Sequence, residues 1–127
     1  MDAEVRKVFE SYAPDVREAL MALRGVILDV ASTTAGVGTV VETLKWGQPS
    51  YLTIGPKSGT TIRLGPHDEG YAFFVPCQTT LVETYRVSFG EKLRFEGNRA
   101  VVFRLGRKPP RKIVAACVKA ALLYHRR

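Results

Sequence analysis

Glu42-Thr-Leu-Lys-Trp-Gly-Gln-Pro-Ser-Tyr51 is the stretch that decides the fold of this chain, and it contains the only tryptophan. Residues on either side of its centre alternate as in a β-strand, with one face formed by Val41, Thr43 and Lys45. The opposite face is formed by Glu42, Leu44 and Trp46. Gly47 and Pro49 break the first strand, and residues 50–54 begin a second. The pattern predicts a corner between two strands, with polar side chains at the bend.

Further strands are predicted downstream by apolar alternation between turn residues. They cover residues 60–64, 71–75, 93–96 and 99–105. The dipeptide Gly97-Asn98 suits the positive φ angles of a tight hairpin between the last two. Because most of these strands are joined by tight turns, we expect neighbouring strands to pair in antiparallel fashion.

Helices are predicted at residues 2–12, 14–32 and 110–124 from apolar residues spaced three and four apart. A short helix at residues 81–86 is predicted from a capping-box pattern, in which Thr79 or Thr80 precedes Glu83. Pro14 suits the first position of the longest helix. Its core-facing stripe is Val16, Leu20, Leu23, Ile27 and Val30. Arg17, Arg24 and Asp29 fall outside this stripe and are predicted to face water.

Length and composition indicate one domain covering residues 1–127, with ordinary apolar (46%) and charged (24%) fractions. The order of elements predicts an α+β fold. We expect a two-layer sandwich, in which an antiparallel meander of about six strands carries the N- and C-terminal helices on one face. The acidic N-terminus lacks a signal peptide's basic region, and no apolar run spans a bilayer, so we expect a cytoplasmic protein. Cys77 and Cys117 are predicted to be separate free thiols that fill the core.

Positive charge is concentrated at the C-terminal end. Residues 91–127 hold eleven basic and two acidic residues, a net charge of +9, whereas residues 1–33 carry −2. The basic segment 92–112 raises the hypothesis of nucleic-acid binding through phosphate contacts. No nucleic-acid recognition motif accompanies it, so a solubilising basic face is the favoured interpretation.

Catalytic patterns are poor. His67 lies in a predicted turn and His125 near the C-terminus, and neither has a nucleophile motif nearby. Both are predicted to be solvated. We therefore expect a non-enzymatic protein with no certain cofactor.

The polar corner is the leading candidate for a ligand site. Lys45 and Arg63 would hold a small molecule's anionic group, and Gln48 and Ser50 would orient it. Trp46 and Tyr51 would form the walls of this pocket, and Gln78 would lie beside it. The competing interpretation makes the two aromatic residues part of the core and gives Gln48 a role in supporting the turn.

A second candidate site is acidic. Glu10, Asp15 and Glu18 lie close together in the first two helices and offer the carboxylate oxygens that hard or borderline cations prefer. Basic residues are interleaved with them, which reduces the attraction for a cation.

Four segments resemble the bacterial YdhG-like domain. They are residues 42–51, 57–65, 77–86 and 93–100, with Trp-Gly-Gln-Pro-Ser-Tyr as the most specific block. The resemblance implies an α+β sandwich like that of frataxin over almost the whole chain. It also implies iron binding as an alternative function, as a chaperone that supplies iron–sulfur assembly proteins. Frataxins present a strongly acidic ridge, from which this basic chain departs, and no frataxin iron ligand can be matched to a position here.

Overall fold

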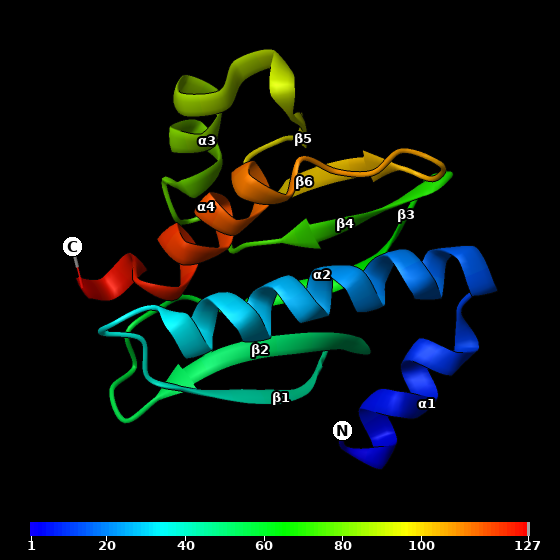
Figure 1. Ribbon diagram of the computed structural model, residues 1–127, viewed down its shortest axis with the longest axis horizontal. Helices are drawn as coiled ribbons and strands as arrows, with labels where there is room; N and C mark the ends of the chain where they lie inside the picture. Colours follow the sequence, from blue (N-terminus) through cyan, green and yellow to red (C-terminus); the bar gives the residue numbers. More distant parts are fainter. Residues whose placement is uncertain (127) are drawn as a thin grey trace.

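The computed structural model describes residues 1–126, which form four α-helices packed on one six-stranded antiparallel sheet (Figure 1). The helices are α1 (Ala3–Ser11), α2 (Pro14–Thr33), α3 (Leu81–Phe89) and α4 (Arg111–Leu122). The strands are β1 (Thr39–Lys45), β2 (Gln48–Ile54), β3 (Ile62–His67), β4 (Gly70–Phe74), β5 (Arg94–Glu96) and β6 (Ala100–Arg104). Two short 3-10 turns follow α3 and α4, namely η1 (Gly90–Lys92) and η2 (Tyr124–Arg126). The predicted α+β sandwich is confirmed.

The sheet is a meander except at its last hairpin. Its strand order is β1-β2-β3-β4-β6-β5, and every neighbouring pair is antiparallel. The chain leaves the sheet after β4, passes through α3 and returns at the outer edge as β5. The hairpin then places β6 beside β4.

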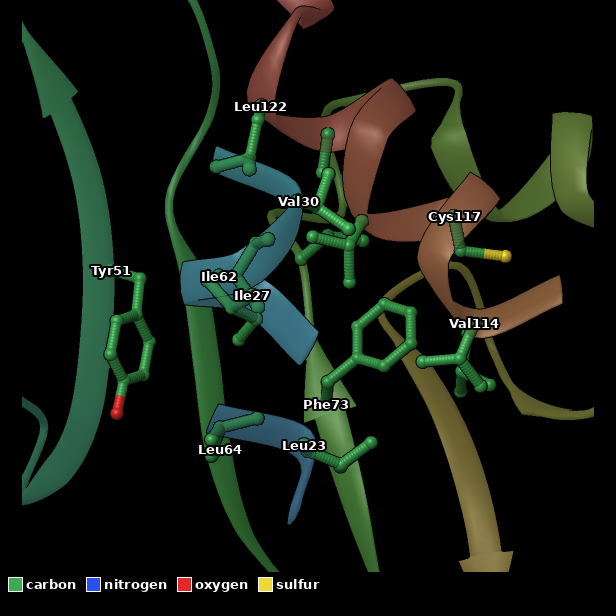
Figure 2. Packing of buried hydrophobic residues seen from close by; sticks show 14 of the residues in the cluster. Leu23, Ile27, Val30, Tyr51, Ile62, Leu64, Phe73, Val114, Cys117 and Leu122 are labelled. Carbon is green, nitrogen blue, oxygen red and sulfur yellow. The ribbon is translucent and has the colours of Figure 1, made fainter. Parts of the chain in front are cut away.

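All four helices contribute to a core on one face of the sheet. Leu23 and Ile27 of α2 and Val114 of α4 pack toward Ile62 and Phe73 of the central strands (Figure 2). The predicted α2 stripe is buried at Leu20, Leu23, Ile27 and Val30. Each large apolar side chain buried here contributes about 1.5–3 kcal/mol to folding. None of the described helices is long and apolar enough to cross a bilayer.

The loop from β2 to β3 is fastened to the end of α4. The buried hydroxyl of Ser58 donates to Leu122 O at 2.8 Å and accepts from Gly38 N at 3.0 Å. Thr60 N donates to Ala121 O at 3.0 Å. A Cβ on Gly59 would lie 2.5 Å from the α4 backbone, so only glycine allows this approach. These contacts fix the start of β3 and hence the position of Arg63.

The predictions of exposure for Arg24 and of burial for Cys77 are wrong. Arg24 is only 20% exposed, because α2 crosses over β1 and brings its guanidinium to Glu42. Cys77 is exposed rather than part of the core, since it follows β4 at the end of the sheet, whereas Cys117 is buried in α4. Both cysteines are free thiols, as predicted.

Candidate functional site

The bend at the centre of residues 42–51 is a two-residue β-hairpin turn. Lys45 pairs with Gln48, and the residues between them, Trp46 and Gly47, have φ angles of 55° and 72°. Two positive φ angles are typical of a type I′ turn, whose twist matches the flanking strands. Trp46 is 88% exposed, so it does not belong to the core.

Strand alternation separates the predicted site residues onto two faces of the sheet. Tyr51 is fully buried on the helix-covered face, where its hydroxyl donates to Glu42 Oε2 at 2.7 Å. Lys45 and Gln48 belong to the opposite, helix-free face. Tyr51 therefore stabilises the fold and does not share a pocket wall with Trp46.

A recess of about 340 Å³ lies on the helix-free face beside the β1–β2 turn. Four of the predicted site residues line it together, namely Lys45, Trp46, Arg63 and Gln78. Its remaining lining comes from Thr61, Val75, Pro76, Cys77 and Arg99. Three cationic side chains from β1, β3 and the β5–β6 turn thus converge on one depression.

Arg63 is held in place by its neighbours on the sheet. Its Nη1 donates to Gln48 Oε1 at 2.8 Å, and its guanidinium carbon lies 5.5 Å from the centre of the Phe74 ring. Gln48 can reach Arg63 because Gly65 has no side chain: a Cβ there would lie 2.5 Å from Gln48 Nε2. Ser50 is buried, and its hydroxyl donates to Gln48 O at 2.9 Å. Gln48 therefore orients Arg63, and Ser50 supports that strand.

The electrostatics of the recess favour an anion. Burial and, to a smaller extent, the positive charge of Arg99 lower the pKa of Arg63. No carboxylate among residues 1–126 forms an ion pair with Arg63 or Lys45, whereas Arg99 lies 3.5 Å from Glu96. A bound anion would reduce the repulsion between Arg63 and Arg99 and would accept hydrogen bonds from both.

Arg99, Thr61 and Cys77 are recess residues that the sequence analysis did not select. Arg99 is 36 positions after Arg63, but it directly precedes Ala100, which pairs with Phe74, which in turn pairs with Arg63. Only the complete strand order reveals this proximity. A prediction that β4 pairs with β6 rather than with β5 would have identified Arg99 as a neighbour of Arg63.

A mixed group of possible metal ligands lies elsewhere on the same face. His67, Asp68 and Glu96 each offer one atom within 4.8 Å of the others, and His67 Nε2 is paired with Glu96 Oε2. The prediction that His67 is solvated is wrong, since its side chain is only 17% exposed. Arg99 contacts the same Glu96 carboxylate, which weakens the attraction for a cation.

The predicted acidic site is not assembled in the described residues. Glu10, Asp15 and Glu18 are exposed on α1 and α2, and the carboxylates do not form a group of ligand atoms. Iron binding by these residues remains a prediction.

In comparisons with known proteins, no family model, curated protein or solved structure matches the chain. The resemblance to the YdhG-like domain therefore remains a prediction from its four segments.

Proposed function

We propose that this protein is a non-enzymatic binding domain that holds a small anionic ligand in the recess on the helix-free face of the sheet. The observation that carries the proposal is the state of Arg63. This cation is fixed by Gln48 and Phe74, lies near Arg99, and has no carboxylate partner among the described residues.

The residues of the recess divide the task of binding. Arg63 and Arg99 supply planar guanidinium groups that match the oxygen spacing of a carboxylate or phosphate. Lys45 adds a mobile point charge from the neighbouring hairpin. Trp46 offers an exposed ring at the rim, against which a flat part of the ligand can pack.

Binding without catalysis is the role that this geometry supports. Neither His67 nor His125 lines the recess, so no imidazole is positioned to act as a general base on a ligand there. The free thiols of Cys77 and Cys117 fit a reducing compartment, and we place this function in the cytoplasm.

The experiment uses the single tryptophan as its reporter, because Trp46 lies at the rim. Fluorescence and calorimetric titrations with inorganic phosphate and with citrate should show saturable binding by at least one anion. Arg63→Met keeps the apolar stem but removes the guanidinium, and should weaken that binding about tenfold or more. Arg6→Met, on exposed α1, is the matched control and should bind as the unmodified protein does.

Absence of saturable binding by both anions would reject the proposal. Equal affinities of the Arg63→Met and unmodified proteins would also reject it, because binding would then occur outside the recess.

A further inference from the structure

Basic side chains extend from the recess across the rest of the helix-free face. Strand register places Arg94 opposite Val102 and Arg104 opposite Gly70. Both positions have the same parity as Arg63, so both side chains belong to the face that carries Lys45. Arg94 and Arg104 are exposed.

The structure therefore divides the basic segment 92–112 between two surfaces. Arg94, Arg99 and Arg104 join Lys45 and Arg63, which are distant in sequence, on the sheet. By contrast, Arg111 begins α4 and binds Asp29 Oδ2 at 3.1 Å, so its charge is partly neutralised. Lys92, Arg107 and Lys108 lie beside Arg94 and Arg104 at the β5–β6 edge. The basic surface therefore combines part of the 92–112 segment with Lys45 and Arg63.

The centre of this face is apolar, and small residues lie there beside the Phe74 ring. Gly65, Ala72 and Ala100 occupy neighbouring strands, and Val102 packs beside them. The helices cover the other side of the sheet, which leaves this side without a covering helix (Figure 1). Six strands spaced about 4.8 Å apart give a platform roughly 24 Å wide.

We propose that single-stranded nucleic acid lies across this platform. The proposal rests on the proposed function, since it assigns the anion in the recess as one phosphate of the strand. Other phosphates contact Arg94 and Arg104, and a base stacks on the exposed ring of Trp46. Proteins that bind single strands without sequence preference combine such a basic path with an aromatic stacking surface.

Charge and shape select this partner. Among the described residues, Glu96 is the only acidic residue that a β-strand places on this face, and its carboxylate is paired with His67 and contacts Arg99. Asp68 and Glu69 of the β3–β4 turn line one depression together with Arg94 and Arg104. The nucleic acid therefore contacts these two arginines on the side that faces the β5–β6 turn. A sheet face this broad cannot enter a duplex groove, whereas flexible single strands can follow it.

The test measures fluorescence anisotropy of a labelled oligothymidylate of about 12 nucleotides at several salt concentrations. Affinity should fall steeply with salt, with a slope near −0.7 for each phosphate contacted. Arg94→Gln/Arg104→Gln should reduce affinity about tenfold or more and should make the slope less negative by about 1.4. Because both residues lie outside the recess, binding of inorganic phosphate should be unchanged in this variant.

Arg6→Gln/Lys7→Gln removes two cations from exposed α1 and is the matched control. Its affinity should remain within about twofold of the unmodified protein. Saturable quenching of Trp46 by the oligonucleotide should accompany the anisotropy change.

Each failure has a separate meaning. Binding of phosphate without binding of oligothymidylate would overturn this inference and leave the proposed function intact. Tighter binding to a duplex of equal length, or binding only to phosphatidylglycerol vesicles, would also overturn it. An equal loss in the two double variants would do the same, because the attraction would then depend on net charge alone. Failure of both phosphate and oligothymidylate to bind would overturn both proposals.

Discussion

Arg24 binds Glu42 through two nitrogen atoms, with Nε 2.5 Å from Oε2 and Nη2 3.2 Å from Oε1. The same carboxylate accepts a hydrogen bond from the hydroxyl of Tyr51. One side chain of β1 is therefore bonded to both α2 and β2. This group connects the helical layer to the hairpin that carries the candidate site, and it explains why a charged residue can lie on the helix-covered face.

Replacing Glu42 by glutamine should destabilise the protein by about 2 kcal/mol at neutral pH, because Arg24 would keep its position without an ionic partner. Burial alone would raise the pKa of Glu42, but hydrogen bonds from Arg24 and Tyr51 outweigh it and lower the pKa below 4.5. A carboxyl group whose pKa is lower in the folded than in the unfolded protein stabilises the fold when the pH lies above the unfolded-state pKa. That stabilisation is lost as the pH falls through the folded-state pKa.

The gap in unfolding free energy between the unmodified and Glu42→Gln proteins should therefore narrow below about pH 4.5. Urea denaturation at pH 7 and at pH 3 measures this change. Glu10→Gln, at an exposed position of α1, should follow the unmodified protein at both pH values. A gap that is independent of pH would show that the carboxylate charge plays no part.

The separation of Glu42 from Lys45 shows how far the sequence could predict the fold. Period-two alternation placed these residues on opposite faces, and the three- and four-residue spacing in α2 identified its buried stripe. Local rules could not predict the pairing of Arg24 with Glu42. It depends on the angle at which α2 crosses β1, and that angle is determined by packing throughout the core.

The candidate site was predictable only in part for the same reason. Lys45, Trp46, Arg63 and Gln78 do line one recess, but Tyr51 lies an odd number of positions after Gln48 and therefore belongs to the opposite face of the strand. Arg99 became a neighbour of Arg63 only because β6, rather than β5, pairs with β4. Such long-range pairing is determined by which strand buries its apolar residues best, so it has no local sequence signal.

Replacing Ser58 by alanine should cost about 2 kcal/mol, because it leaves Gly38 N–H and Leu122 C=O without a buried partner. The midpoint of urea denaturation should fall accordingly. Ser88→Ala, on the exposed side of α3, is the control and should leave the midpoint almost unchanged. Equal midpoints for the two variants would show that the fastening of the β2–β3 loop to α4 contributes little to stability.

A methyl group at Gly65 should impair anion binding while sparing the fold. The new Cβ would meet Gln48 Nε2, the movable end of a side chain, so Gln48 would turn away and release Arg63. Phosphate or citrate binding should weaken severalfold in the Gly65→Ala variant. Unfolding free energy should change by less than about 1 kcal/mol, since alanine also restricts the unfolded chain.

Gln48→Ala provides the comparison for this prediction, because it removes the same hydrogen bond without adding a group at position 65. The two variants should show similar losses of anion affinity in calorimetry. Unchanged affinity in both would mean that Arg63 does not need Gln48 to bind an anion.

Trp46 combines a left-handed backbone with a large exposed ring, and the two properties should respond in opposite directions to substitution. Asparagine tolerates positive φ and forms the preferred Asn-Gly turn with Gly47, so Trp46→Asn should stabilise the fold by about 1 kcal/mol. Its melting temperature should rise by about 4 °C. Affinity for oligothymidylate should nevertheless fall about tenfold, because the stacking surface is lost.

Trp46→Ala is the comparison: it should show the same loss of affinity for oligothymidylate without the gain in stability from the turn. If Trp46→Asn binds as tightly as the unmodified protein, the ring is not a stacking surface, and its exposure at this turn has another cause.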